Sequence, residues 1–132
     1  MKVDGGCHCG QLTYEADVDR QRVIICHCTD CQIMSGSAYR TVAFTREDGF
    51  RLLTGEIKTY VKTADSGNRR AMGFCPDCGT HVYATSIGEG PKVYGLRVGT
   101  ANQRDALVPT SQCWCDSALD WVQDISALER VS

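Results

Sequence analysis

Short segments in which hydrophobic and polar residues alternate cover most of the chain. Residues 12–16 (Leu-Thr-Tyr-Glu-Ala) give the clearest case, and a period of two residues is typical of a β-strand with one buried face. Short β-branched or aromatic segments predict further strands at residues 23–25, 39–44, 50–54, 57–61, 70–74, 81–85 and 93–98. The pattern therefore favours a protein built mainly from short strands.

Polar segments that contain glycine separate these strands. Residues 47–49, 55–56 and 88–91 have the composition of turns, and the polar residues 63–68, which include Gly67, predict the tip of a hairpin. Helical turns are expected only at residues 30–35 and 126–130, and there is no long amphipathic helix. The sequence thus predicts an all-β, or β-rich, fold in which residues 1–132 form a single domain.

Composition and the order of apolar residues narrow the class of protein. The 132 residues are 42% hydrophobic and 23% charged, as in an ordinary globular domain. No apolar segment approaches the ~18 residues that a membrane span needs, and the first residues lack the apolar run of a signal peptide. We therefore expect a cytoplasmic protein without a membrane partner.

Nine cysteines set this sequence apart, and their number is odd. Disulfide scaffolds are usually shorter, secreted and even in cysteine number, so clustered cysteines in a reducing compartment favour metal binding or chemistry. The formal net charge is −2, and seven thiolates with two Zn²⁺ ions would bring it to about −5. Because nucleic-acid binders are basic, nucleic acid is not an expected partner.

The Cys75-Pro76-Asp77-Cys78-Gly79 segment has the form of a zinc knuckle. A Cys-x-x-Cys turn places two sulfurs on one side of a tight loop. Pro76 fixes one φ angle, and Gly79 can adopt the left-handed conformation that such a turn needs. A redox dithiol is the alternative use of the motif, but that dithiol usually opens a helix in a βαβ unit, and no such pattern follows here.

The Cys7-His8-Cys9-Gly10 segment supplies a second pair of sulfurs. Residues i and i+2 of an extended segment point to the same face, and modest bending can bring their sulfurs to one ion because each Zn–S bond is ~2.3 Å long. The two pairs predict a closed structural zinc site on Cys7, Cys9, Cys75 and Cys78. The alternative is that the two pairs are unrelated and consist of buried free cysteines.

Cys26, Cys28 and Cys31 place three further thiols within six residues. A catalytic zinc commonly has three protein ligands and a fourth position for water or substrate. A thiol that enters this position would lose its proton and become a nucleophile at neutral pH. Alternatively, a distant side chain fills the fourth position and makes the site structural; the candidates are His8, His27, His81, Cys113 and Cys115.

Three motifs occur in order over most of the chain. They are Gly6-Cys7-His8-Cys9-Gly10 followed by Tyr14, Cys26-His27-Cys28-Thr29-Asp30-Cys31 followed by Ser35-Gly36-Ser37-Ala38, and Phe74-Cys75-Pro76-Asp77-Cys78-Gly79-Thr80. Together these motifs resemble the glutathione-dependent formaldehyde-activating enzyme family, which also contains centromere-protein-V-like members. A lone Cys-x-x-Cys would be weak evidence, whereas three ordered motifs with this spacing are specific.

The resemblance implies a β-tent fold of twisted antiparallel sheets with two zinc sites. By motif position, the structural zinc falls on Cys7, Cys9, Cys75 and Cys78, and the second, catalytic zinc on Cys26, Cys28 and Cys31. The implied activity is that of a carbon–sulfur lyase, which joins glutathione or a related thiol to formaldehyde or another small aldehyde and gives S-hydroxymethylglutathione. Since three cysteines hold zinc less securely than four, we expect the second ion to be lost more readily on purification. A non-catalytic zinc-stabilised module that binds a thiol ligand or a protein is the alternative function.

Two positions depart from the family pattern. The residue after the third cysteine of the loop is often basic in the family, but it is Gln32 here. A histidine that often precedes a tryptophan near the C-terminus is replaced by Gln112, nine residues before Trp121. These differences put the substrate, rather than the fold, in question.

Further candidate side chains lie near the second cysteine group in the sequence. His27 is the candidate proton acceptor, since imidazole exchanges protons near neutral pH. Arg40 and Ser35 are candidates for binding the substrate, Arg40 by bidentate pairing with a carboxylate. An exposed strand arginine and a turn serine are the respective alternatives. Cys113 and Cys115 either supply a fourth ligand or are small core residues.

Overall fold

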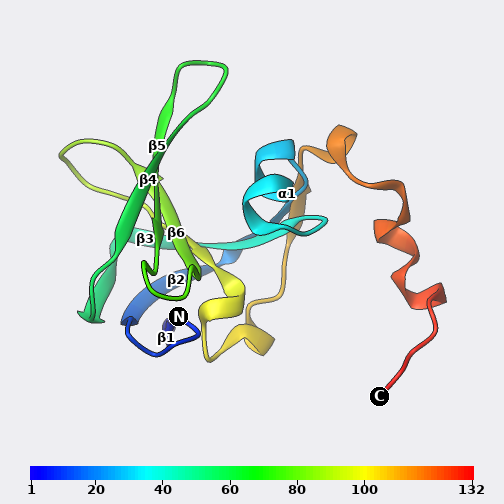
Figure 1. Ribbon diagram of the computed structural model, residues 1–132, viewed down its shortest axis with the longest axis horizontal. Helices are drawn as coiled ribbons and strands as arrows, with labels where there is room; N and C mark the ends of the chain where they lie inside the picture. Colours follow the sequence, from blue (N-terminus) through cyan, green and yellow to red (C-terminus); the bar gives the residue numbers. More distant parts are fainter.

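The computed structural model describes residues 1–132 and is organised around one eight-stranded sheet (Figure 1). The strands are β1 (Lys2–Gly6), β2 (Thr13–Cys26), β3 (Arg40–Thr54), β4 (Lys58–Thr63), β5 (Arg69–Phe74), β6 (His81–Ser86), β7 (Gly95–Arg97) and β8 (Ser111–Cys113). Their order in the sheet is β1-β2-β3-β7-β6-β5-β4, and all these neighbours are antiparallel. The mainly antiparallel β fold predicted from the sequence is confirmed, although β1 and β8 were not predicted.

The strands β2 and β3 each replace two shorter predicted strands. The turn predicted at residues 47–49 is wrong, because β3 continues through it with Asp48 in a left-handed conformation (φ 52°) and with register shifts against β2. The Asp48 N–H donates to the carbonyl of Lys92 (2.6 Å), and the Asp48 carboxylate accepts from the Lys92 N–H (3.0 Å). Residues 47–49 therefore form a β-bulge within β3 instead of a turn, and hydrogen bonds join this bulge to Lys92.

The second half of the sheet is a series of hairpins that matches the sequence pattern more closely. The predicted hairpin tip between β4 and β5 is present, and Gly67 has the positive φ (88°) that its turn requires. Gly55 likewise has a φ of 84° between β3 and β4. The strand predicted at residues 93–98 is shorter than expected, because Val98 already begins the 3₁₀ helix η1 (Val98–Thr100).

Helical structure is confined to short segments. Helix α1 (Thr29–Ser35) confirms the helical turn predicted at residues 30–35, and Gly36 ends it in the left-handed conformation (φ 64°). The remaining helices are the 3₁₀ segments η1, η2 (Arg104–Ala106), η3 (Cys115–Ser117) and η4 (Asp120–Ala127), so most of the turn predicted at residues 126–130 lies beyond η4. None of the helices has the length and apolar character needed to cross a membrane.

The hydrophobic core is built from β1, β2, β3, β6, β7 and the segments around them. Thirteen buried residues form it: Val3, Leu12, Tyr14, Ala16, Val18, Val23, Ala43, Cys75, Val82, Leu96, Val98, Ala101 and Leu107. The Tyr14 hydroxyl hydrogen-bonds to the Thr100 hydroxyl at 2.9 Å. The chain passes so close at Gly5 that a Cβ atom there would collide with the Thr100 carbonyl. Glycine therefore lets β1 close against η1.

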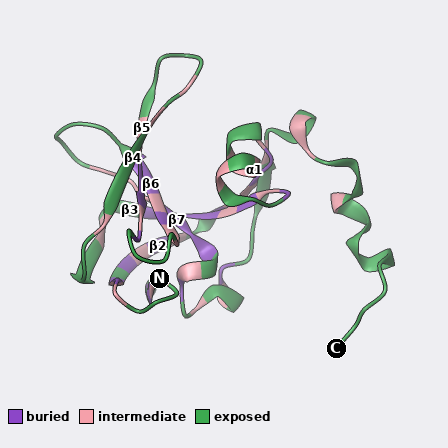
Figure 2. Cartoon of the chain, in the orientation of Figure 1, coloured by how far each residue is buried: buried purple, intermediate pink, exposed green.

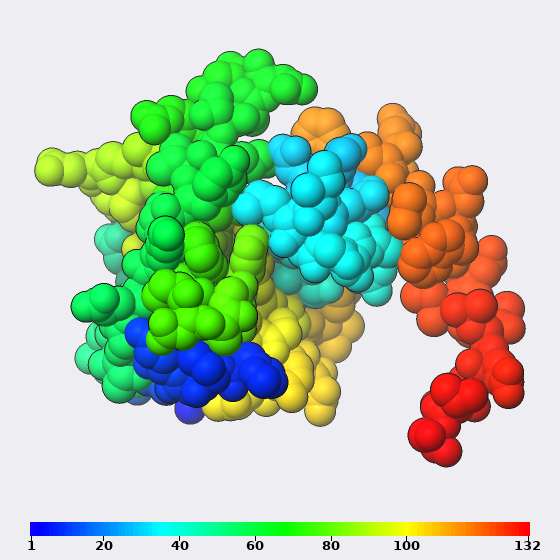
Figure 3. Space-filling view, viewed as in Figure 1, coloured from blue at the N-terminus to red at the C-terminus, as the bar shows by residue number.

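The segment after β8 lies outside the sheet. Figures 1 and 3 show it passing beside α1 and ending away from the strands, and Figure 2 shows that most of it is exposed. η4 has no buried residue, and Trp121 is 54% exposed. The parts of the chain that position the cysteines are thus the sheet, α1 and β8.

Candidate metal centre

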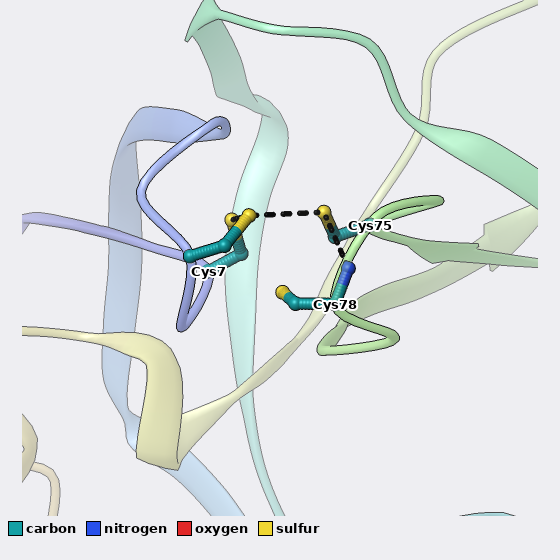
Figure 4. A group of neighbouring side chains, drawn as sticks. Cys7, Cys75 and Cys78 are labelled. Carbon is teal, nitrogen blue, oxygen red and sulfur yellow. Dashed lines mark hydrogen bonds between the residues drawn. The ribbon is translucent and has the colours of Figure 1, made fainter.

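Four cysteines from two distant loops converge at one edge of the core. Cys7 and Cys9 lie between β1 and β2, and Cys75 and Cys78 lie in the turn between β5 and β6. Their Sγ atoms all lie within 4.8 Å of one another, and Figure 4 shows Cys7 facing Cys75 and Cys78. The two segments predicted to act together are therefore brought together by the fold.

The spacing of these sulfurs fits one tetrahedral zinc ion. The Sγ atoms of Cys7 and Cys9 are 3.6 Å apart, and those of Cys9 and Cys75 are 3.8 Å apart. In a tetrahedron with Zn–S bonds of ~2.3 Å, neighbouring sulfurs are ~3.8 Å apart. No other protein group is needed to complete four-coordination, so a metal held here would be closed to substrate.

Hydrogen bonds from neighbouring groups reach three of the four sulfurs in this group. The Leu12 N–H donates to Cys7 Sγ (3.2 Å), and the Gln11 side-chain amide donates to Cys75 Sγ (3.3 Å). Hydrogen bonding by the Thr80 hydroxyl to Cys78 Sγ, at 3.2 Å, is the main reason why the pKa of Cys78 is lowered to about 5. Metal ligands must be deprotonated, so these contacts favour metal binding.

The second cysteine group is built where β2 ends and α1 begins. Cys26 is the last residue of β2, and Cys28 is the N-cap of α1, where its sulfur accepts a hydrogen bond from the Cys31 N–H at 3.2 Å. The Sγ atoms of Cys26, Cys28 and Cys31 lie within 4.8 Å of one another, so they could hold a single metal ion. The side chains of Cys26 and Cys31 are joined by a hydrogen bond. This bond is the main reason why the pKa of Cys26 is lowered to about 5 and why the pKa of Cys31 is raised.

The two C-terminal cysteines differ in their relation to this group. Strand β8 runs parallel to the end of β2 and places Cys113 in register with Cys26, and the His27 N–H donates to the Cys113 carbonyl at 3.1 Å. Burial, followed by interaction with Cys26, raises the pKa of Cys113 to about 11. Cys115 is exposed and begins η3. Cys113 is therefore a neighbour of the three-cysteine group, whereas Cys115 lies outside it.

A pocket of about 230 Å³ opens beside the three cysteines. We call it the cysteine pocket; its lining residues are Ile24, Cys26, Cys28, Cys31, Arg40, Val42, Phe44, Lys62, Arg70, Met72, Ala84, Gly95, Arg97 and Trp114. The lining combines three thiols, four cationic side chains and a largely apolar remainder. Arg97, Lys62 and Trp114 were not predicted, because they come from β7, β4 and the residue after β8, far from the cysteines in sequence.

Two of these arginines are buried without a counter-ion. Arg40 is 6% exposed and Arg97 is 9% exposed, and neither takes part in any of the five ion pairs of the protein. The Nη2 atom of Arg40 and the Nε atom of Arg97 have no hydrogen-bond partner. Burial, and then the nearby charge of Arg40, lowers the pKa of Arg97 to about 9, so the Arg97 guanidinium stays charged at neutral pH.

A second hollow lies on the other side of the same two arginines. It has a volume of about 310 Å³ and is lined by Arg40, Arg97, Ser35 and His81 among others. Ser35, predicted to bind substrate, thus lines this hollow beside Arg40 but does not line the cysteine pocket. The largest hollow, about 510 Å³, lies over β1, β2 and β3 and contains no cysteine.

His27 points into the protein rather than into the cysteine pocket. It is 1% exposed and does not line that pocket, its Nε2 atom is 2.8 Å from the Gln112 side-chain oxygen, and its Nδ1 atom has no hydrogen-bond partner. Gln32 donates to the carbonyls of His27 and Ser117, each at 2.9 Å. The two glutamines that depart from the family pattern therefore brace the cysteine loop against β8 and η3, and a proton-accepting role for His27 stays a prediction.

The profile of a family described as "Glutathione-dependent formaldehyde-activating enzyme" matches residues 2–117, which contain all nine cysteines. The chain belongs to this family. The resemblance stated from the three sequence motifs is thus confirmed. Both cysteine groups lie within the range that matches the glutathione-dependent formaldehyde-activating enzyme family.

Two individual proteins are similar to this member of the glutathione-dependent formaldehyde-activating enzyme family. An uncharacterised lyase of Schizosaccharomyces pombe is 27% identical over 91 residues, a match that spans 68% of this chain and 63% of that protein. The match thus covers less than two thirds of that relative. A crystal structure of a Rhodobacter sphaeroides protein has a TM-score of 0.60 at 22% identity and covers 83% of this chain and 98% of the other. This second likeness supports the fold alone.

Proposed function

We propose that this protein is a zinc-dependent carbon–sulfur lyase that joins a small thiol to a small aldehyde. Glutathione and formaldehyde are the substrates that the family description suggests. The observation that carries the proposal is the cysteine pocket, where three thiols close enough to share one ion line a pocket that is open to small molecules. By contrast, the four-cysteine group has a full set of ligands.

In this proposal the two cysteine groups have different roles. Cys7, Cys9, Cys75 and Cys78 hold a structural zinc that joins the β1–β2 loop to the β5–β6 turn. Cys26, Cys28 and Cys31 hold the second zinc. When bound there, zinc supplies a positive charge that favours the thiolate form of an incoming thiol.

The residues of the pocket position the reactants. Apolar side chains from β2, β3, β5 and β6 line part of the pocket, and an apolar wall strengthens the electrostatic interactions beside it. Arg40, at the first position of β3, faces both the cysteine pocket and the hollow that contains Ser35. These two residues are therefore candidates for binding substrate, while Gln32 and Gln112 hold the cysteine loop in place.

The reaction requires no redox partner. The thiolate sulfur attacks the aldehyde carbon, a C–S bond forms, and the carbonyl electron pair moves to oxygen, which takes up the proton released by the thiol. His27 is 1% exposed and does not line the cysteine pocket, so in this proposal water at the pocket mouth carries the proton, and direct proton transfer by His27 stays a prediction. None of the nine cysteines forms a disulfide, which suits a reducing compartment such as the cytoplasm and a single zinc-stabilised domain over residues 1–132.

The proposal is tested by zinc content and by exchange kinetics in the same preparations. Zinc per chain is measured for the wild type, Cys28→Ser and the control Cys115→Ser, and formaldehyde–glutathione exchange is followed by NMR with each protein. We expect Cys28→Ser to lose one zinc and the acceleration of exchange, and Cys115→Ser to keep both. If the wild type holds the second zinc and leaves the exchange rate unchanged, the protein is a binding module rather than a lyase.

A further inference from the structure

The cysteine pocket has more positive charge than its own residues can neutralise. Its lining contains Arg40, Lys62, Arg70 and Arg97 and no aspartate or glutamate. Only Lys62 has an acidic partner, Asp30, at 2.8 Å. The hollow on the other side of Arg40 and Arg97 also contains no carboxylate and adds His81. One thiolate–zinc group with a net charge of about −1 balances one of the three unpaired arginines.

Two of the unpaired arginines are buried, so their positive charge cannot be stabilised by solvent. Arg40 and Arg97 are both more than nine-tenths buried, and each has a side-chain nitrogen without an acceptor. The one hydrogen bond from the Arg97 guanidinium goes to the Gly95 carbonyl at 3.3 Å. A buried charged donor that lacks a partner is costly, so such groups in proteins usually have a ligand or counter-ion for part of the functional cycle.

The size and lining of the pocket restrict that ligand to a small one. A volume of about 230 Å³ is below the range of pockets that enclose drug-sized molecules. The apolar residues around the arginines give a large polar ligand few partners. Neither the pocket nor the hollow beside it has an acidic group that could pair with an ammonium ion. The ammonium group of glutathione therefore has no partner here, and the tripeptide must extend outside the pocket.

We propose that Arg40 and Arg97 bind a carboxylate carried by the aldehyde substrate, so that the preferred electrophile is a small oxo acid. This inference rests on the proposed function, because it names the second substrate of the same site. Guanidinium groups pair with carboxylates through parallel N–H···O bonds, and two of them at the wall of an apolar pocket select a planar anion. An uncharged aldehyde such as formaldehyde leaves both arginines unpaired.

The chemistry favours a carboxylate on the aldehyde. In a 2-oxo acid such as glyoxylate the carboxylate is bonded directly to the reacting carbon, so a pocket that contains both thiols and arginines can hold both groups of one small molecule. The sulfur of the substrate thiolate bonds to the aldehyde carbon, the C=O π pair moves to oxygen, and that oxygen takes the thiol proton. The product is a hemithioacetal that keeps the carboxylate of the oxo acid, and this carboxylate stays paired with the arginines.

Binding is tested first, independently of catalysis. The probes are glyoxylate and acetate, with acetaldehyde as the uncharged control, and binding to the zinc-loaded protein is followed by saturation-transfer NMR. We expect glyoxylate and acetate to bind the wild type and to bind Arg97→Met and Arg40→Met about 10- to 100-fold more weakly, as expected for lost charged hydrogen bonds. Arg69→Met is the matched control, because Arg69 is an exposed arginine that does not line the pocket. No binding to the folded wild type, or equal binding to Arg97→Met, would overturn the proposal.

Exchange kinetics then identify which substrate carries the carboxylate. The thiol is 2-mercaptoethanol, which has no charge, and the aldehyde is glyoxylate or acetaldehyde. We expect faster enzyme-dependent exchange with glyoxylate, competitive inhibition by acetate, and a KM for glyoxylate that rises at least about tenfold in Arg97→Met. If arginine dependence appears only with glutathione, and as a higher KM for glutathione, the carboxylate belongs to the thiol and the proposal fails.

The two proposals fail in different ways. If acetate and glyoxylate bind in an Arg97-dependent manner but no thiol–aldehyde pair is accelerated, the anion site stands and the lyase function fails. If formaldehyde–glutathione exchange is accelerated, insensitive to acetate and unchanged in Arg97→Met, the lyase function stands and the oxo-acid substrate fails. Circular dichroism and zinc content show whether each variant is folded and loaded.

Discussion

Replacing Arg97 by methionine is expected to make the ligand-free protein more stable. Methionine keeps a long apolar side chain but removes the charge that is buried beside Arg40. A pKa lowered from 12.5 to about 9 corresponds to roughly 5 kcal/mol of unfavourable free energy in the charged form at neutral pH. The pKa is lower in the folded state, so this penalty is present below pH 9 and is relieved only as the pH rises toward 12.5. The substitution also removes the hydrogen bond to Gly95 and leaves some unfilled space, so we expect a gain of about 1–3 kcal/mol.

Urea denaturation at a fixed free zinc concentration measures this gain, because a metal that leaves on unfolding makes the apparent stability depend on its concentration. With a urea slope of ~1–3 kcal/mol per M, the midpoint should rise by about 0.5–2 M at an unchanged slope. The exposed control Arg69→Met should change the free energy of unfolding by less than about 0.5 kcal/mol. If Arg97→Met instead loses more than about 1 kcal/mol, Arg97 is already paired in the free protein, and the reasoning from an unbalanced charge is refuted.

Three further substitutions test other parts of the structure. Gly5→Ala should lower the free energy of unfolding by about 2–4 kcal/mol, because the added Cβ meets a backbone carbonyl of η1, whereas Gly99→Ala meets no atom within 4 Å and should be nearly neutral in thermal melts. Gln32→Ala removes two hydrogen bonds that brace the cysteine loop, and should weaken the second metal about tenfold in a chelator competition while leaving the first unchanged. In metal-free protein, Thr80→Val should raise the pKa of Cys78 from about 5, so that its alkylation by iodoacetamide near pH 6 becomes slower; equal rates in the two proteins would show that Thr80 does not stabilise the thiolate.

The local sequence predicted those features that depend on neighbouring residues. The short helix after Cys28 and the hairpin tip at Gly67 are properties of segments a few residues long. The convergence of Cys7 and Cys9 with the Cys75–Cys78 turn is a long-range contact, and it was predicted because four sulfurs complete a tetrahedral zinc site. The predicted turn at residues 47–49 failed because the Asp48 segment bonds to Lys92, a partner more than forty residues away. Tertiary contacts there override the local preference for a turn.

The composition of the cysteine pocket was beyond prediction for the same reason. Arg97 reaches it because β7 pairs with β3, and Lys62 of the edge strand β4 reaches it beside Asp30 of α1, with which it forms an ion pair. No spacing rule connects these residues to Cys26. Gln32 and Gln112 were noticed as departures from the family pattern, but their bracing contacts with His27 became visible only in the folded chain.

The central claim is that one cysteine group is closed and the other is open to a substrate thiol. Cadmium-113 NMR of the cadmium-substituted protein tests this claim most directly, because each metal gives its own resonance. The account predicts two resonances, of which only one shifts when 2-mercaptoethanol is added, and the same one disappears in Cys28→Ser. A single resonance in fully loaded protein, or two resonances that are both insensitive to the thiol, would contradict it.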